Sequence, residues 1–165
     1  DLTPFEKTQG RLQEYSDRFN NEVLLAMNDR DPKLHDIYRV NLGDGKRTLV
    51  QKNEGGYTGF LTDDAFKVRY ALKSRPDGGN DVLVADGKGG FKEWTTIPQE
   101  DSLTSSPLGF DKSGNTLYFR DSRGRDTGAL FSLDTKAKGC RQSSPNCQKP
   151  SRRRRAASSA FNRSK

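Results

Sequence analysis

Residues 59–97 read GFLTDDAFKVRYALKSRPDGGNDVLVADGKGGFKEWTTI, and this stretch decides the fold. Short apolar segments alternate in it with turns rich in Gly, Asp and Asn. Such turns join antiparallel strands, because Gly readily adopts a positive φ and Asp or Asn bonds to its own backbone. The stretch therefore predicts a complete antiparallel sheet, with strands at Gly59–Leu61, Val68–Leu72, Val82–Val84 and Phe91–Ile97.

The middle of this stretch occurs three times along the chain. Each copy has an apolar strand, a polar turn that ends in arginine, and a second apolar strand that begins seven residues later. The arginines are Arg30, Arg75 and Arg123, which are 45 and 48 residues apart. A period of this length, with several short strands per repeat, is typical of β-propeller blades. A helical repeat would instead show apolar residues at three-to-four spacing.

The repeat predicts an all-β fold, namely a partial β-propeller of about three four-stranded antiparallel blades. We expect one propeller domain over residues 1–138, with blades at about 11–53, 57–98 and 104–138. The third blade stops before its outer strand. The first residue is Asp1 and not Met, which suggests a segment of a longer protein.

The last part of the chain, residues 139–165, differs in charge and pattern from the rest. The whole chain carries a net charge of +7, from 29 basic and 22 acidic residues. No Asp or Glu follows Asp134, and ten Lys or Arg lie between Lys136 and Lys165. The preceding part therefore has 19 bases (29 minus 10) against 22 acids. We expect a disordered basic tail, and our hypothesis for the abrupt change is a translated reading-frame shift.

Four consecutive arginines in the tail are candidates for contact with a polyanion through charge alone: Arg152, Arg153, Arg154 and Arg155. Only Phe161 lies near them, so base stacking and specific nucleic-acid recognition are not expected. Cys140 and Cys147 are interpreted as solvated thiols, because the only histidine, His35, is far away in the sequence. We expect no metal site and no cofactor.

No apolar run approaches the roughly 20 residues that cross a bilayer. The composition predicts a soluble chain without membrane contact. The sequence does not decide whether the parent protein is cytoplasmic or periplasmic.

Several stretches resemble a known family. They are DLTPFE at 1–6, LAMNDRDPKLHDIYRVNL at 25–42, PLGFD at 107–111 and DSRGRD at 121–126. They look like the N-terminal propeller of bacterial acylaminoacyl-peptidase and dipeptidyl-aminopeptidase-like members of the prolyl oligopeptidase family of serine peptidases. The resemblance covers residues 1 to about 138, and NDRDP followed by HDIYR is its most specific part.

The resemblance implies that catalysis and the control of access lie in two different domains. In that family, a propeller of seven or eight blades covers an α/β-hydrolase domain that carries the Ser, Asp and His of a serine peptidase. The propeller restricts access to short peptides. The implied partners of this chain are thus the hydrolase domain of the parent protein and the short peptide substrates of that parent.

Catalytic residues are not expected in this chain. The nucleophile of such a hydrolase lies in a Gly-x-Ser-x-Gly turn, and the 165 residues contain no such motif. His35 lies early in the chain, in a predicted link between strands. We therefore expect no peptidase activity from the chain alone.

The repeated arginines Arg30, Arg75 and Arg123 are the candidate site residues. A guanidinium has five donors, so each arginine can bond carbonyls in the turn between two strands of its blade. Alternatively, they ring a face that points toward a peptide carboxylate or the hydrolase domain. We favour the first interpretation, because a residue repeated in every blade usually belongs to the blade. Trp94 is likewise interpreted as inter-blade packing.

Two other functions stay open at this point. One is a free propeller-type binding module, akin to the periplasmic propeller of the Tol system. The other is polyanion binding through the basic tail. In either case, open blade edges predict a chain that is poorly stable or prone to association.

Overall fold

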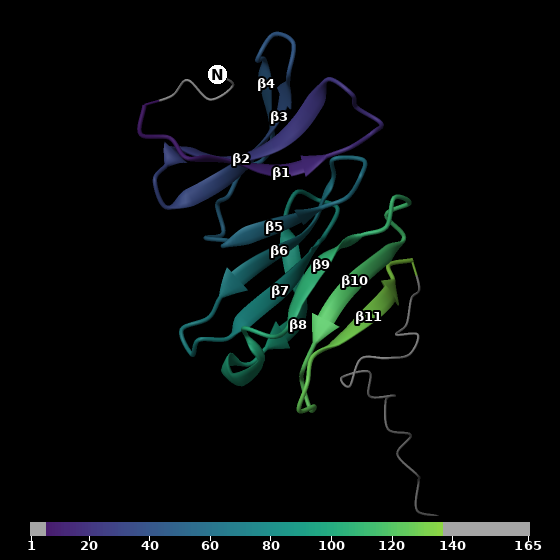
Figure 1. Ribbon diagram of the computed structural model, residues 1–165. Helices are drawn as coiled ribbons and strands as arrows, with labels where there is room; N and C mark the ends of the chain where they lie inside the picture. Colours follow the sequence, from purple (N-terminus) through teal and green to yellow (C-terminus); the bar gives the residue numbers. More distant parts are fainter. Residues whose placement is uncertain (1–5, 137–165) are drawn as a thin grey trace, which may run out of the picture.

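Three antiparallel sheets make up the part of the chain that the computed structural model describes, residues 6–136 (Figure 1). The first contains β1 (Gly10–Tyr15), β2 (Glu22–Asp31), β3 (Leu34–Asn41) and β4 (Arg47–Gln51). The second contains β5 (Gly59–Thr62), β6 (Val68–Ser74), β7 (Asn80–Ala85) and β8 (Phe91–Ile97). The third contains β9 (Ser106–Phe110), β10 (Thr116–Asp121) and β11 (Ala129–Asp134).

Within each sheet the strands lie in chain order, as in a propeller blade. The first strands of successive sheets lie next to each other, so that Gln13 of β1 donates a hydrogen bond to the carbonyl of Phe60 in β5, at 2.9 Å. Strand β5 in turn contacts β9. The predicted all-β fold, a partial β-propeller, is therefore confirmed. We call the three sheets blades 1, 2 and 3.

The hairpin between β2 and β3 is tighter than the sequence predicted. Residues 28–30 were expected to form the turn, but they lie in β2, which continues to Asp31. The pairing register between β2 and β3 shifts between Met27 and Asp31, as it does at a β-bulge. A bulge lets a strand continue through a polar segment, because it absorbs an extra residue without ending the pairing.

Apolar side chains fill the space between blades 1 and 2. Alternate residues of β2 point toward blade 2, and Arg39 of β3 covers this core with its guanidinium 4.4 Å from the centre of the Phe19 ring. Burying a large aliphatic side chain of this kind favours folding by about 2 kcal/mol. The buried members of this core are Leu24, Ala26, Ile37, Phe60, Phe66 and Ala71.

A second core lies between blades 2 and 3. Trp94 of β8 packs edge-on against Tyr70 of blade 2 and Phe119 of blade 3, so it lies at the contact between the two blades. The buried members of this core are Tyr70, Val82, Ile97, Leu117 and Phe119. A smaller third cluster of Leu25, Met27 and Val40 lies on the face of blade 1 that points away from blade 2.

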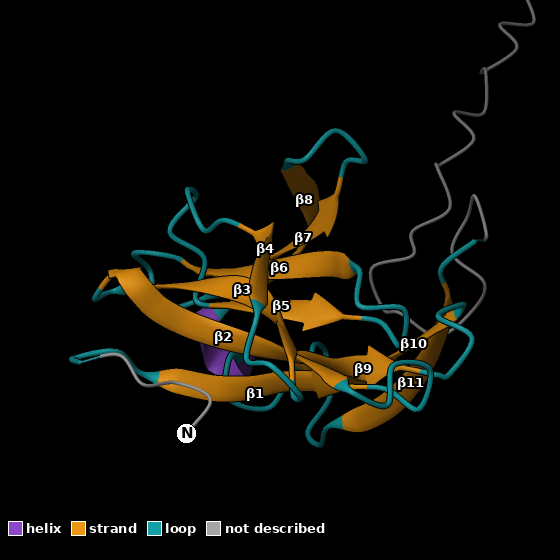
Figure 2. Cartoon of the chain, turned by 90° about the horizontal axis from the view of Figure 1, so that it is seen from above, coloured by secondary structure: helices purple, strands orange, loops and turns teal. Residues whose placement is uncertain are grey.

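The connection from blade 2 to blade 3 contains one short 3₁₀ helix, η1 (Gln99–Asp101), drawn purple in Figure 2. Within residues 6–136, no helix has the length and apolar character that crossing a membrane requires. The predicted disordered tail at 139–165 lies outside the described residues. The assignment of residues 1–138 to one domain stays a prediction.

Candidate functional site

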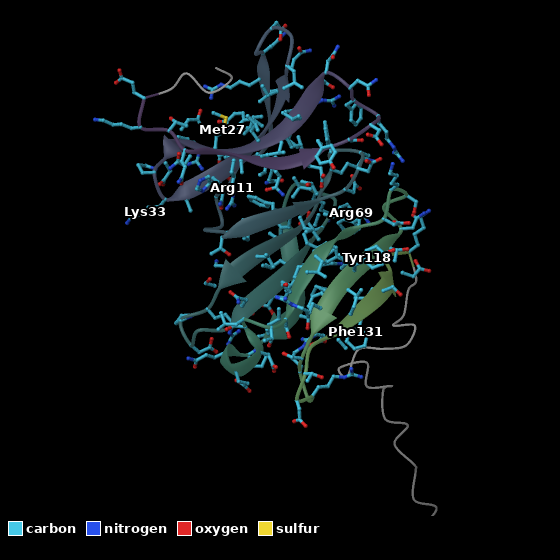
Figure 3. All side chains as sticks on the ribbon, viewed as in Figure 1. Arg11, Met27, Lys33, Arg69, Tyr118 and Phe131 are labelled. Atoms are coloured by element: carbon cyan, nitrogen blue, oxygen red, sulfur yellow. The ribbon has the colours of Figure 1, made fainter. Side chains whose placement is uncertain are left out.

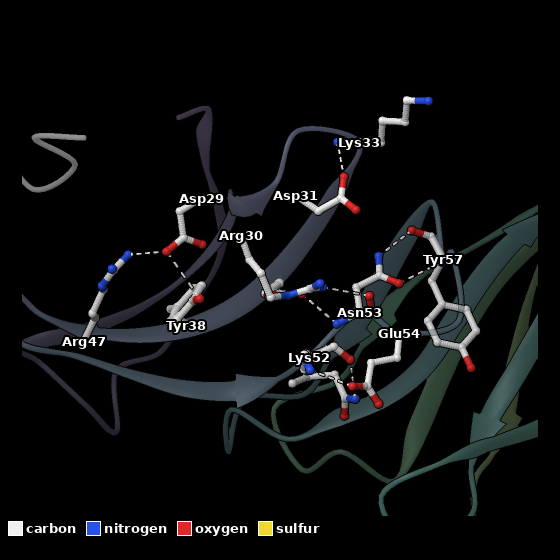
Figure 4. A network of polar contacts seen from close by, with 12 residues as sticks. Asp29, Arg30, Asp31, Lys33, Tyr38, Arg47, Lys52, Asn53, Glu54 and Tyr57 are labelled. Carbon is white, nitrogen blue, oxygen red and sulfur yellow. Dashed lines mark hydrogen bonds and ion pairs between the residues drawn. The ribbon is translucent and has the colours of Figure 1, made fainter. Parts of the chain in front are cut away.

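Arg30 forms a clamp at the hairpin between β2 and β3 (Figure 4). Its Nε and Nη2 donate to the two carboxylate oxygens of Asp36, at 2.8 and 2.9 Å. Nη2 also donates to the carbonyl of Asn53, at 2.9 Å, and the Asn53 N–H donates to Asp36 Oδ1, at 2.7 Å. A guanidinium and a carboxylate that share two parallel hydrogen bonds form one of the stronger pairs in proteins.

The clamp fixes the linker between blades 1 and 2. Asn53 is buried, and its side chain bonds both the N–H and the carbonyl of Tyr57, at 2.9 and 2.7 Å. Tyr57 packs edge-on against Phe60 in the core between the blades. The Asn53 side chain bonds the linker backbone at two points. Asn53 therefore connects the hairpin of blade 1 to the linker that leads into the first strand of blade 2.

The charge of Asp36 is stabilised by this arrangement. Burial alone would raise the pKa of the Asp36 carboxyl, but the hydrogen bonds from Arg30 and from the Asn53 backbone outweigh it, so the pKa is lowered. The same hydrogen bonds to Asp36 raise the pKa of the Arg30 guanidinium. Both groups thus stay ionised near neutral pH.

Arg123 forms a similar clamp between blades 3 and 2. Its guanidinium bonds both carboxylate oxygens of Asp121, each at 2.8 Å. Its Nη1 reaches across to β8, where it donates to Thr95 Oγ1 at 2.8 Å and to the Thr96 carbonyl at 2.9 Å. Burial alone would raise the pKa of Asp121, but the bonds from Arg123 outweigh it and the pKa is lowered.

Arg75 closes the turn between β6 and β7. It bonds Asp77 within the turn, and its Nη1 donates to Asp81 Oδ1 at 3.2 Å. The same Asp81 oxygen accepts a hydrogen bond from the Thr96 hydroxyl, at 2.9 Å. Since Arg123 bonds the Thr96 carbonyl, the polar contacts run without a break from the turn of blade 2 to that of blade 3.

The three arginines thus lie beside three separate hairpin connections at the same end of the blades, with Arg30 at the end of β2, and each is paired with a carboxylate of its own blade. The structure does not bring them together into one cluster of charge. Their bonds reach carboxylates as well as the carbonyls that the sequence suggested. The four tail arginines, Arg152 to Arg155, lie outside the described residues.

A hollow lies at the opposite end of the blades, where the inner strands β1, β5 and β9 run into their turns. It is open to solvent and has a volume of about 90 Å³. All three blades contribute to its lining, which combines carboxylates with one ammonium and one aromatic ring. The lining residues are Glu14, Thr62, Asp64, Phe110, Asp111 and Lys112.

Arg18 ties the three turns together beside this hollow. Its Nε pairs with Asp64 of blade 2 at 2.8 Å, and its Nη2 donates to the carbonyl of Lys112 in blade 3 at 3.0 Å. Lys112 returns to blade 1 through an ion pair with Asp17, at 3.0 Å. These contacts cross solvent-exposed surface, so each one adds little to stability, but together they order the rim of the hollow.

Glu14 is an acid of the hollow whose pKa is raised. Burial raises the pKa of its carboxyl, and the nearby Asp64 and Asp63 charges raise it further. Hydrogen bonds from the Tyr15 N–H and the Thr62 hydroxyl oppose this shift only in part. The carboxyl of Glu14 is therefore easier to protonate than an exposed glutamate.

The residues of the hollow were not predicted from the sequence. The available signal was an acidic residue just after each inner strand, at Asp17, Asp63 and Asp111, with a spacing close to that of the arginines. Such residues also occur as ordinary turn formers, and Asp63 and Asp111 do bond the backbone of their own turns. The signal therefore could not separate a turn residue from a site residue.

His35 lies in β3, close to the clamp and far from the hollow. Burial lowers the pKa of its imidazole, and Arg11 lowers it further, so the ring is neutral near pH 7. Among residues 6–136, no group of three or more His, Cys, Asp or Glu side chains is placed to hold a metal ion.

Comparison with known proteins gives two relatives. The chain is 48% identical over 134 residues to dipeptidyl aminopeptidase BIII of Pseudoxanthomonas mexicana, an alignment that covers 81% of this chain and 19% of that protein. It is 32% identical over 116 residues to dipeptidyl peptidase family member 6 of Caenorhabditis elegans, which covers 66% of this chain and 16% of the relative. No protein-family model and no solved structure matches the chain.

The chain spans less than a fifth of the length of each of these two relatives. Identity of 48% over 134 residues is nevertheless far too high for a chance match. The chain is therefore homologous to a segment of dipeptidyl aminopeptidase BIII, which confirms the predicted resemblance to a dipeptidyl-aminopeptidase-like peptidase.

Proposed function

We propose that this chain is the non-catalytic propeller portion of a serine peptidase of the dipeptidyl aminopeptidase type. In the intact protein it contacts an α/β-hydrolase domain and limits access to that domain to short peptides. The single observation that carries this proposal is the 48% identity with dipeptidyl aminopeptidase BIII over 134 residues, which are 81% of this chain.

The hollow on the inner strands supports the gating part of the proposal. In a propeller the first strand of each blade faces the central channel, which is the route by which a peptide would enter. The carboxylates of Glu14, Asp64 and Asp111 and the ammonium of Lys112 give this part of the channel a polar, mainly negative lining. Such a lining can bind the polar main chain and the charged amino end of a short peptide, while the blades exclude a folded protein.

The test is a chimera. The aligned segment of the Pseudoxanthomonas mexicana protein is replaced with the corresponding residues of this chain. The chimera should fold and release dipeptides from a short peptide, the activity that the name of the relative states. It should also discriminate against a folded protein that carries the same amino-terminal sequence.

A matched chimera carries Glu14→Gln and Asp64→Asn, which keep the size of the two side chains and remove two charges from the hollow. If the hollow guides peptides, this variant should have a higher KM for short peptides with an unchanged kcat, because the groups lie away from the reacting bond. A chimera that folds but releases no dipeptide would show that this segment does not serve the proposed function.

A further inference from the structure

The chain contains three Asp-Gly pairs, and each lies at an exposed hairpin turn: Asp44–Gly45, Asp77–Gly78 and Asp86–Gly87. In such a pair the amide nitrogen of the glycine can attack the carboxyl carbon of the aspartate, because glycine has no Cβ that hinders the approach. The three glycines all have a positive φ, of 70°, 84° and 76°. By sequence alone the three pairs are therefore equivalent sites of modification, and only their contacts distinguish them.

The aspartate side chains of the three pairs are placed alike. In each pair one carboxylate oxygen accepts a hydrogen bond from the amide two residues further on, at 2.9 Å for Lys46, 3.0 Å for Gly79 and 2.7 Å for Lys88. This Asx turn directs the side chain forward along the backbone. The side chain of each aspartate is thus turned toward the glycine amide that would attack it.

The glycine amides differ in their hydrogen bonds. The Gly45 amide donates to the Asn41 carbonyl at 2.9 Å, and the Gly78 amide donates to the Arg75 carbonyl at 3.1 Å. The Gly87 amide donates to no group in the described part of the chain. An amide must leave its acceptor before its nitrogen can form a new bond. Of the three nitrogens, that of Gly87 can therefore attack without first losing a contact of the folded chain.

Arg75 gives Asp77 a second protection. Its Nε and Nη2 donate to Asp77 Oδ2 at 3.1 and 3.0 Å, and these bonds lower the pKa of the Asp77 carboxyl. A carboxylate held in its ionised form reacts poorly with an amide nitrogen, because its oxygen leaves as water only from the protonated acid. The Asp86 carboxylate, by contrast, accepts bonds only from the backbone amides of Lys88 and Gly90 within the described residues.

The Asp86 turn belongs to the blade that has both neighbours within this chain. It joins β7 and β8 of blade 2, which packs against blade 1 on one side and blade 3 on the other. Figure 3 labels Arg11 on blade 1 and Tyr118 on blade 3, with blade 2 between them. The contacts of the turn are therefore those of a blade with both neighbours in place.

We propose that Asp86 is a site of spontaneous isomerisation to isoaspartate. The Gly87 nitrogen gives up its proton and bonds to the carboxyl carbon of Asp86, and one carboxyl oxygen leaves as water, so that a succinimide ring forms. Water then opens the ring. Opening at the side-chain carbonyl restores aspartate, and opening at the main-chain carbonyl gives isoaspartate. The water gained equals the water lost, nothing is oxidised, and the reaction is independent of the peptidase role proposed above.

The product would change the hairpin between β7 and β8. In isoaspartate the backbone runs through the side-chain Cβ, which adds a methylene to the chain and leaves the former main-chain carboxyl free. In the unmodified chain the Asp86 N–H donates to the Gly90 carbonyl and the Gly90 N–H donates to Asp86 Oδ1, both at 3.0 Å. An added methylene disturbs this register where β8 begins. A methyltransferase that recognises isoaspartyl carboxylates is the class of enzyme that would act on the product.

The test is incubation of the full 165-residue chain in heavy-oxygen water, at a temperature below its unfolding transition. Each passage through the succinimide replaces one oxygen of the aspartate with the heavy isotope. Peptide mapping by mass spectrometry measures the label at each pair, and fragmentation distinguishes isoaspartate from aspartate. In the folded chain Asp86 should gain label about fivefold faster than Asp44 or Asp77, since one hydrogen bond on the attacking amide accounts for a factor of this size.

The urea-unfolded chain is the matched control, because its three pairs keep the Asp-Gly sequence without the contacts of the turns. There the labelling rates of Asp44 and Asp77 should approach that of Asp86. Gly87→Ala in the folded chain should remove most of the label from Asp86 and leave the other two pairs unchanged, because a Cβ hinders the attack. A Cβ at Gly87 would meet no other atom within 4 Å, so this variant should fold.

Equal labelling of the three aspartates in the folded chain would overturn the proposal. An excess of label at Asp86 that stays the same in urea would also contradict it, since the neighbouring sequence and not the fold would then set the rate. Unchanged label at Asp86 in the Gly87→Ala chain would show that the exchange does not pass through the proposed ring.

Discussion

Asp36 lies six residues after Arg30 and accepts two hydrogen bonds from its guanidinium across the β2–β3 hairpin. The same spacing joins Arg75 to Asp81 in blade 2. In blade 3 the residue six positions after Arg123 is Ala129, which has no acceptor, and Arg123 bonds Asp121 instead. The repeated arginine thus keeps an acidic partner in every blade although the position of that partner changes.

Asp36→Asn should destabilise the chain by about 2–3 kcal/mol. The change keeps the shape of a buried side chain but removes the charge that pairs with Arg30, and it replaces one acceptor with a donor that faces the guanidinium and the Asn53 N–H. Urea unfolding monitored by circular dichroism measures the free energy of unfolding.

Glu54→Gln is the control for this change. Glu54 forms an ion pair with Lys52 in the same linker, but the pair is exposed. The control should unfold at the urea concentration of the parent chain, since exposed pairs contribute little. Equal effects of the two substitutions would mean that the clamp has no special role.

Stability should fall in acid below about pH 4. The pKa values of Asp36 and Asp121 are lowered in the folded chain, so the unfolded chain binds more protons at acid pH. Their contribution is complete above the unfolded-state pKa of about 3.9, and it is lost as the pH falls through the lower folded-state values. The pKa of Glu14 is raised, so Glu14 acts in the opposite sense and disfavours folding once it ionises.

Urea midpoints measured between about pH 3 and pH 6 check this prediction. The parent chain should lose stability toward the acid end of this window, and the double variant Asp36→Asn, Asp121→Asn should lose much less. A double variant with the same pH slope as the parent would assign the acid sensitivity to other groups.

Arg123→Lys should loosen the contact between blades 3 and 2. A single ammonium cannot hold Asp121 with two parallel bonds and also reach Thr95 and the Thr96 carbonyl, so we expect a loss of about 2–3 kcal/mol. Hydrogen exchange should rise first in β9, β10 and β11, while the amides of blade 1 keep their protection.

Arg120→Lys is the matched control for Arg123→Lys. Arg120 lies on β10 three residues earlier, is exposed, and makes one bond to the Leu103 carbonyl. Its replacement should leave the exchange of all three blades unchanged. Faster exchange in blade 3 with this control would mean that the effect of Arg123→Lys is not specific to the contacts of Arg123.

Gly79→Ala should destabilise the turn between β6 and β7 by about 2 kcal/mol. A Cβ at this position would lie 2.6 Å from the carbonyl oxygen of Ile97, a backbone atom that cannot move without shifting β8. Gly59→Ala is the control, because its nearest neighbour would be the end of the Leu72 side chain at 3.9 Å. Thermal unfolding of the two variants is the measurement. A lower unfolding temperature for Gly79→Ala alone would assign the loss of stability to the steric clash and not to the replacement of a glycine as such.

Most of the fold could be predicted from the sequence. Strands and turns are local features, so alternating apolar residues and Gly-rich or Asp-rich turns were enough to place the four strands of blade 2. The bulge in β2 could not be predicted, because residues 28–30 have the composition of a turn, whereas the structure places them in β2 between Met27 and Asp31, which both pair with β3. The hollow could not be predicted from the sequence, since Glu14, Asp64 and Lys112 are far apart in the chain and come together only when the three blades pack.

The sequence by itself determined the number of repeats, their all-β character and the kinship with a dipeptidyl aminopeptidase, because each of these rests on the order of residues along the chain. Only the tertiary structure decided what the repeated arginines bond, which ends of the inner strands enclose the hollow, and which apolar faces stay open. These features depend on distances between residues of different blades. The same tyrosine position is buried at Tyr70 and exposed at Tyr118, because one of the two blades has a neighbour in this chain and the other has none among the described residues.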